Sequence, residues 1–261
     1  MKKSTTNEKL ISFNLVMGIL HLVQGLIMMF LASSVIQKIA EFQPTIMQWY
    51  LKYNPVTQSL ELASKKLFEL PFGVFVSMFL LVSATAHFVI VLNSKKYVKD
   101  LAKGINQFRW FEYAISSSIM ICLIATLFGV YDIATLVLIF SANAGMNLFG
   151  LVMEQLNSGS DKKNVNWGPF IWGSIVGLAP WIAILMYMFG TGNFDMVPWF
   201  VWAIIGAYFV AFNTFPINMI LQYKKVGKWK DYLYGERVYI VLSLVAKSVL
   251  AWLVLFGAMQ P

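Results

Sequence analysis

Lys247 is the residue whose position most directly suggests chemistry. It stands in the segment VYIVLSLVAKSVLAWLVLF, with mainly apolar residues on both sides. A charged side chain at the centre of a membrane helix costs about 2.5 to 3.5 kcal/mol, so such a lysine requires an explanation. Burial favours the neutral amine, whose lone pair can attack an aldehyde and form a Schiff base. A structural lysine paired with an acid is the alternative.

Glu112, in FRWFEYAISSS, is the carboxylate expected to face that lysine. It is the only acid well inside an apolar run, because Asp132 and Glu154 lie at the ends of theirs. Helical side chains lean toward the N-terminus of their helix, which brings the Lys247 stem toward the level of Glu112. A carboxylate there would stabilise a protonated Schiff base. An interfacial ion pair between Glu112 and Arg109 is the alternative.

Two histidines, His21 and His87, occur at similar depth in the first two apolar runs. Together with nearby polar residues they predict a hydrated polar cavity on the Glu112 side. A histidine that only bonds two helices together is the alternative for each. A metal site is not expected, because two histidines and one glutamate lack local ligand spacing. The other expected cavity residues are Gln24, Ser83, Ser116, Ser117, Ser118, Asn143 and Ser243.

Large apolar side chains in the same runs would suit a long polyene. Trp181 follows Pro180 in GLAPWIAI, and Tyr113, Met146 and Phe212 also fall within apolar runs. Core packing or a place in an aromatic belt is the default role of any single one.

The elements that must position these residues are membrane helices. The chain has 59% hydrophobic and 12% charged residues, and its mean hydropathy is +0.68, which indicates an all-α integral membrane protein. A helix needs about 20 apolar residues to cross a bilayer, and seven runs satisfy this. Cys122 is the single cysteine, so no intramolecular disulfide can form. The seven predicted spans cover residues 11–33, 70–93, 107–129, 131–154, 169–189, 198–222 and 237–257.

The distribution of basic residues predicts the orientation. Cytoplasmic loops carry the excess of lysine and arginine, and most of these residues fall on the side of the N-terminus, in the loops after the second, fourth and sixth spans. We therefore expect a cytoplasmic N-terminus and an extracellular C-terminus. The net charge of +8 reflects this topology, and no nucleic-acid partner is expected.

The connection of about residues 34–69 is longer than ordinary helix connections and should be a structured outer loop. Its segment PTIMQWYLKYNP fits a short hairpin or cap, and an amphipathic surface helix fits equally well. We expect residues 1–261 to form a single seven-helix domain in the cell membrane, with the lipid bilayer around it.

Three segments carry a resemblance to a known family. INQFRWFEYAISSSIMICLIA, GLAPWIAIL and YLYGERVYIVLSLVAKSVLAW resemble the heliorhodopsins, and the similarity runs from the first helix to the last. The resemblance implies a rhodopsin-like bundle in which Lys247 binds all-trans retinal covalently. It also implies that Glu112 is the counterion and that Ser243 forms a hydrogen bond near the Schiff base.

The same resemblance assigns further residues and a partner. It places His21, His87, Ser83, Ser117 and Asn143 in a polar cavity, and it implies a homodimer. Gly173 and Gly177 form a GxxxG pair that would permit close approach of two chains, although packing within one chain explains it equally well. The chromophore pocket implied by the resemblance comprises Met146, Gly150, Pro180, Trp181 and Phe212.

These observations favour a light-sensing photoreceptor that does not pump ions, has a slow sensory-type photocycle and signals to an unidentified cytoplasmic partner. A light-driven proton transporter is the nearest alternative, but it would need titratable groups on both sides of the chromophore. A small-solute transporter that uses Lys247 and Glu112 as a coupling pair is the other alternative, although no inverted repeat is evident. An enzyme is not expected, because no nucleophile and base can be paired.

Overall fold

The computed structural model describes residues 2–159, 165–190, 192 and 197–259. The first long helix is α1 (Lys2–Phe30), which continues through the π-turn η1 (Leu31–Val35) into α2 (Gln37–Glu41). Two strands follow, β1 (Thr45–Asn54) and β2 (Ser59–Glu69). The remaining elements are α3 (Phe72–Leu92), α4 (Ser94–Leu101), α5 (Gln107–Leu127), α6 (Ile133–Leu156), α7 (Gly168–Phe189), α8 (Trp199–Tyr223), η3 (Gly227–Lys230) and α9 (Tyr232–Gly257).

Seven of the described helices are long and apolar enough to cross a membrane, as predicted. Five of them match the predicted spans to within a few residues at both ends. The first and last differ, because α1 begins at Lys2 where the prediction began it at 11, and α9 begins at Tyr232 where the prediction began it at 237. The Asp231 side chain accepts a hydrogen bond of 3.1 Å from the Leu233 amide and caps the helix there. The polar first turns of α9 therefore belong to the helix.

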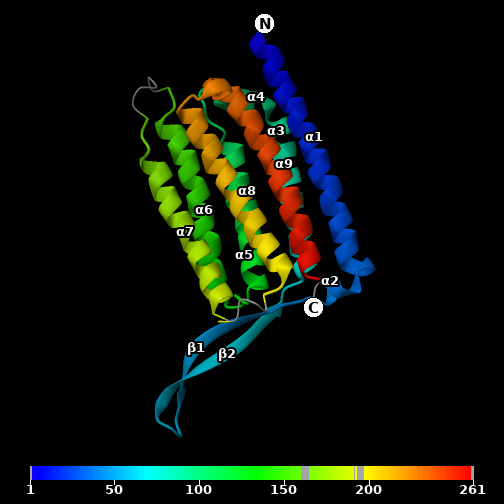
Figure 1. Cartoon of the computed structure of the whole chain (residues 1–261), viewed down its shortest axis with the longest axis vertical. Helices are drawn as coiled ribbons and strands as arrows, with labels where there is room; N and C mark the ends of the chain where they lie inside the picture. The colour runs from blue at the N-terminus through cyan, green and yellow to red at the C-terminus, as the bar shows by residue number, and fades with distance from the viewer. Residues whose placement is uncertain (1, 160–164, 191, 193–196, 260–261) are drawn as a thin grey trace.

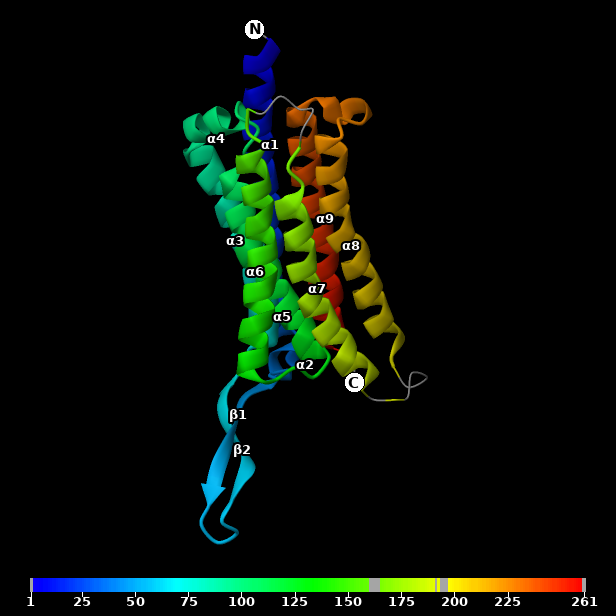
Figure 2. The same ribbon diagram turned by 90° about the vertical axis from the view of Figure 1, so that its left-hand side faces the viewer.

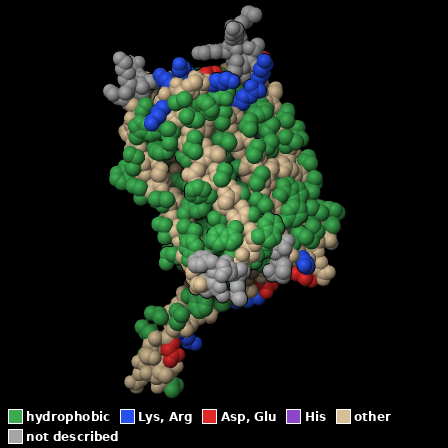
Figure 3. Space-filling model, in the orientation of Figure 1, with side chains coloured by type: hydrophobic (Ala, Val, Ile, Leu, Met, Phe, Trp, Pro, Cys, Tyr) green, Lys and Arg blue, Asp and Glu red, His purple; other side chains and the backbone are tan. Residues whose placement is uncertain are grey.

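The long helices lie side by side in one bundle, with the N-terminus at one end and the hairpin at the other (Figures 1 and 2). We call the part of the bundle between the level of Lys247 and the N-terminal end the N-side half, and the remainder the hairpin-side half. Lysine and arginine side chains gather at the N-terminal end, and apolar side chains cover the flanks of the bundle (Figure 3). The distribution is that of a membrane protein with two unlike ends.

Strands β1 and β2 form the antiparallel hairpin that projects from the bundle, so the structure contains the hairpin and not the alternative surface helix. Its base is fixed to the α5–α6 connection, because the Met47 amide donates to the Tyr131 carbonyl at 2.9 Å. Further out, pairing in register places one row of exposed apolar side chains on a single face. This row is Trp49, Leu51, Tyr53, Leu60 and Leu62.

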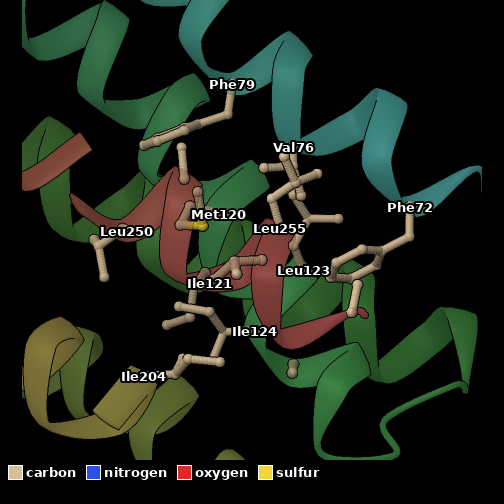
Figure 4. Packing of buried hydrophobic residues seen from close by; sticks show 14 of the residues in the cluster. Phe72, Val76, Phe79, Met120, Ile121, Leu123, Ile124, Ile204, Leu250 and Leu255 are labelled. Carbon is tan, nitrogen blue, oxygen red and sulfur yellow. The ribbon is translucent and has the colours of Figure 1, made fainter. Parts of the chain in front are cut away.

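The hairpin-side half is filled by apolar side chains from α3, α5, α8 and α9 (Figure 4). Val76, Ile121 and Ile124 are completely buried. The buried polar side chains described in this half are the hydroxyl groups of Ser77, Ser118, Thr126 and Tyr208, together with the Asn143 amide, which donates to Ser118 at 3.0 Å. Dispersion and close packing therefore hold this half together.

Candidate functional site

Lys247 and Glu112 meet in the interior, as predicted. The Lys247 Nζ atom donates to the Glu112 carboxylate and to Ser83 Oγ at 2.8 Å. The Ser83 hydroxyl in turn donates to Glu112 Oε1 at 2.7 Å. The three side chains come from α9, α5 and α3, and Lys247 is only 5% exposed. A buried ion pair with an additional hydroxyl therefore connects three helices.

The alternative partner of Glu112 has other contacts. Arg109 pairs with Glu154 of α6 and Glu236 of α9. Both carboxylates are about 1% exposed, so this is a second buried ionic cluster. Glu112 therefore forms its ion pair with Lys247 and not with Arg109.

Regular helical spacing brings the functional side chains of α9 onto one face. Glu236, Ile240, Ser243 and Lys247 recur at intervals of four, three and four residues, and all are buried. Ser243 lies one turn before Lys247. Its hydroxyl has no hydrogen-bond partner among the described residues, so it is free to bond a group placed beside the lysine amine.

A cavity of about 420 Å³ adjoins the lysine. Of the predicted pocket residues, Tyr113, Ser117, Met146, Gly150 and Phe212 line it. Apolar residues that the prediction missed complete much of the wall, among them Phe79, Trp110, Met120, Phe215 and Leu250. Nothing in the sequence distinguishes these side chains from ordinary core residues.

Pro180 and Trp181 were expected in this wall, and the structure places them outside the set of lining residues. The Trp181 ring stacks on Tyr208 at 4.8 Å between centroids and meets the Phe212 ring edge-on at 5.5 Å. Because Tyr208 and Phe212 do line the cavity, Trp181 supports the wall from behind. The rotation of α7 about its axis determines whether the Trp181 ring faces the cavity, and the sequence motif alone does not specify that rotation.

Glycines let the helices around the cavity approach closely. A Cβ atom on Gly150 would lie 2.2 Å from the Trp110 ring. On Gly173 and Gly177, Cβ atoms would meet Phe149 and Met146 of α6 at 2.9 and 2.3 Å. The GxxxG pair therefore packs α7 against α6 within the chain, and it gives no support to a dimer.

The cavity fits a long apolar aldehyde such as retinal. Its walls are mostly aliphatic and aromatic, and Lys247 is the only charged residue among the described side chains that line it. An amine at the margin of an apolar cavity, with a carboxylate directly behind it, is suited to hold such a ligand as a charged imine. Lys247 would make the bond, and Glu112 with Ser83 would face the resulting charge.

A smaller polar cavity of about 20 Å³ lies on the N-side of this pair, enough volume for a water molecule. His87, Glu112 and Ser243 line it, as does Asn14, which the prediction missed. The ring of His21 stacks on that of His87 with centroids 5.5 Å apart. His87 therefore lines the cavity with Glu112, as predicted, whereas His21 contacts the His87 ring and is not among the residues that line the cavity.

Of the predicted members of the polar cavity, the described residues that line it include only His87 and Ser243. Gln24 accepts a hydrogen bond of 3.3 Å from the Trp252 indole at the α1–α9 contact. Asn143 donates to Ser117 and Ser118 at 2.7 and 3.0 Å, within the α5–α6 contact. Both residues form hydrogen bonds between helices, which is the ordinary role of an amide in a membrane bundle.

The ionic cluster around Arg109 was missed by the sequence analysis. Asn106 donates to Glu236 at 2.6 Å, and the Trp110 indole donates to Glu154 at 2.8 Å. One signal was available, because Glu236 stands eleven residues before Lys247 and so shares its helix face. Starting the last span at 237 excluded it.

Comparison with protein families identifies the family to which the chain belongs. The heliorhodopsin family model matches residues 10–259. A comparison with curated proteins finds no match. The matched region contains all the site residues described above and nearly the whole bundle, which confirms the resemblance seen in the sequence. The chain therefore belongs to the heliorhodopsin family, and it is a multi-pass membrane protein of the retinal-binding, rhodopsin type.

Proposed function

We propose that this protein is a light sensor that does not pump ions, in which Lys247 holds all-trans retinal covalently and Glu112 is the counterion. The observation that carries the proposal is the buried Lys247–Glu112 pair beside the apolar cavity. When bound through a protonated Schiff base, retinal supplies visible absorption and a light-driven isomerisation that displaces charge at Lys247 Nζ.

The chain's own residues prepare the site for that event. Glu112 balances the positive charge on Nζ, and Ser83 holds both partners through its two hydrogen bonds. The apolar walls limit access of water, so the charges interact more strongly than they would in solution. Displacement of charge at Nζ would consequently change the electrostatic potential at the polar groups of the N-side half.

The absence of pumping is proposed from the contrast between the two halves. A proton relay needs titratable groups on both sides of the chromophore. In the described part of the hairpin-side half the buried polar side chains are hydroxyls and the Asn143 amide, and no buried carboxylate or histidine accompanies them. A proton that leaves Nζ is therefore retained on the N-side, and a slow sensory-type photocycle with a cytoplasmic signalling partner follows as part of the proposal.

Topology and assembly complete the proposal. The basic end of the bundle (Figure 3) supports a cytoplasmic N-terminus and an extracellular C-terminus, with the hairpin outside the cell. A homodimer is proposed on the family resemblance and on the exposed apolar row of the hairpin.

The test is a visible absorption spectrum of protein expressed with added retinal. The wild type should be coloured, and Lys247→Ala and Lys247→Arg should both be colourless, since neither side chain can form the imine. Lys228→Ala, which removes an exposed lysine of η3, should remain coloured. Covalent visible absorption in Lys247→Ala would refute the assignment.

Glu112→Gln sharpens the same experiment. Two unit charges about 4 Å apart interact by about 4 kcal/mol at an effective dielectric constant of 20. Loss of the carboxylate should therefore shift the visible band and lower the pH at which that band disappears by about three units. An unchanged spectrum and unchanged titration would assign the counterion to another residue.

A further inference from the structure

Asn14 of α1 connects His87 to the ionic cluster at the N-terminal end. It is 1% exposed, and its Oδ1 atom lies 2.8 Å from His87 Nδ1. Its Nδ2 atom donates to the Leu10 carbonyl at 2.8 Å and to the Tyr97 hydroxyl at 3.4 Å. Tyr97, on α4, donates to Glu236 at 3.2 Å.

The acceptors around Asn14 determine which way its amide points. A backbone carbonyl such as that of Leu10 can only accept a hydrogen bond. The Tyr97 proton is directed to the Glu236 carboxylate, so the Tyr97 oxygen faces Asn14 as an acceptor. Burial, followed by the nearby Glu236 charge, raises the pKa of Tyr97 well above its ordinary value and keeps this hydroxyl protonated. Two acceptors thus require the NH2 group of Asn14 on their side and its oxygen toward His87.

The amide orientation then fixes the proton on the histidine. Asn14 Oδ1 can only accept, so His87 Nδ1 must carry a hydrogen. The other ring nitrogen, Nε2, keeps its lone pair. His21 differs, because neither of its ring nitrogens has a partner among the described residues, and nothing comparable selects its tautomer.

We infer that Asn14 is a positioning residue that holds His87 in the Nδ1–H tautomer and thereby makes Nε2 the base for the proton displaced by light. The inference rests on the proposed function. In the transfer an N–H bond at Lys247 Nζ breaks and an N–H bond at His87 Nε2 forms, with Glu112 or water between them. The electron pair stays on Nζ, and the positive charge moves to the imidazole ring, whose Nδ1–H still donates to Asn14.

Nitrogen-15 NMR of histidine-labelled protein in the dark tests the tautomer without any light reaction. The chain has two histidines, so His21→Phe leaves only the His87 signals. We expect a protonated Nδ1 and a bare Nε2. Asn14→Leu removes the hydrogen bond from Nδ1–H, which favours the Nδ1–H tautomer over the Nε2–H tautomer about fivefold. The ratio of the two tautomers should therefore shift toward Nε2–H by about that factor. Asn14→Asp keeps the accepting oxygen and should retain the Nδ1–H form.

Asn93→Leu is the matched control. Asn93 also donates to the carbonyl four residues earlier, that of Val89 at 2.9 Å, but within the described part of the chain it forms no hydrogen bond with a histidine. This variant should leave the His87 signals unchanged. An Nε2–H tautomer in the wild type, or the same ratio in Asn14→Leu, would overturn the inference. If Asn14→Leu does not fold, Asn14→Ala is judged by the same signals.

Flash photolysis then tests the role of Nε2. Asn14→Leu should slow formation of the blue-shifted transient about fivefold, and Asn14→Asp should restore the rate. A changed tautomer with unchanged kinetics would show that His87 is not the base. A wild type without any light-induced absorption change would refute the proposed function, while the dark NMR result would still decide the tautomer.

Discussion

The two halves of the bundle are built on different physical principles. The N-side half contains the Arg109 cluster, the two histidines and the buried Asn14. The hairpin-side half is a close-packed apolar core in which the described buried polar groups are hydroxyls and one amide, that of Asn143. Lys247 and Glu112 lie at the boundary between them. The Lys247 charge therefore has polar surroundings on one side and mainly apolar packing on the other.

Under the proposed function, this difference would give direction to a charge displacement without transport of an ion. Buried charges are tolerated in the N-side half because each has an opposite charge or several donors around it. Such a network can be rearranged by adding or removing one proton. The apolar core contains no buried carboxylate or histidine among its described residues, so the addition or removal of a proton does not act on it directly.

The largest stability effect should come from breaking the N-side half at Arg109. Arg109→Met leaves Glu154 and Glu236 as unpaired buried carboxylates, and the expected loss in the free energy of unfolding is about 3 to 5 kcal/mol. Denaturation of the purified protein in detergent measures this. Lys96→Met, which removes the exposed Lys96–Asp100 pair, should cost under about 0.5 kcal/mol. Equal losses of unfolding free energy in the two variants would show that the Arg109 cluster stabilises the protein no more than a surface ion pair does.

A truncation in the hairpin-side half should act on stability alone. Ile124 is completely buried in the apolar core, and it is not among the cavity-lining residues. Ile124→Ala should therefore cost about 2 to 5 kcal/mol through the cavity it leaves. The visible band and the rate of the blue-shifted transient should stay as in the wild type, as measured on the same sample. A large change in photochemistry would mean that the apolar half participates in the response.

The smallest effect is expected at the hairpin tip, which lies outside both halves. Hydrogen bonds from Asn54 and Thr57 lower the pKa of Glu61 from its ordinary value of 4.5. The ionised Glu61 side chain therefore stabilises the folded tip at pH values above its ordinary pKa. This stabilisation is lost as the pH falls through the lowered pKa of Glu61. Hydrogen exchange at the Val56 amide, which donates to Asn54 at 2.9 Å, should accelerate at that acidic pH relative to neighbouring amides. Glu61→Gln should remove this pH dependence, and photochemistry should not change.

The sequence was sufficient to predict the contact between Lys247 and Glu112, because charged residues are rare inside the apolar runs that contain them. A lysine and a carboxylate inside separate apolar runs have few alternatives to each other, and the structure brings them together. Seven spans followed from the same logic of length and polarity. Composition and helical period are local properties, and a single sequence expresses them well.

Features that depend on the relative rotation of helices could not be predicted in the same way. Glu154 and Glu236 lie near span ends, where a sequence does not distinguish a carboxylate exposed at the interface from one buried against Arg109. The direction of the Trp181 ring depends on how α7 is turned toward α8. Asn143 and Gln24 were grouped with the histidines by depth alone, and depth does not specify which helix face a residue occupies.

The central claim is that the proton displaced by light stays in the N-side half. The most direct measurement is flash excitation of the retinal-bound protein in sealed vesicles, with a pH-sensitive dye in the bulk solution and absorption recorded at the same time. We predict a blue-shifted transient without stoichiometric proton release and without a sustained pH change under continuous light. A steady pH gradient that an uncoupler abolishes would contradict the account and make the protein a pump.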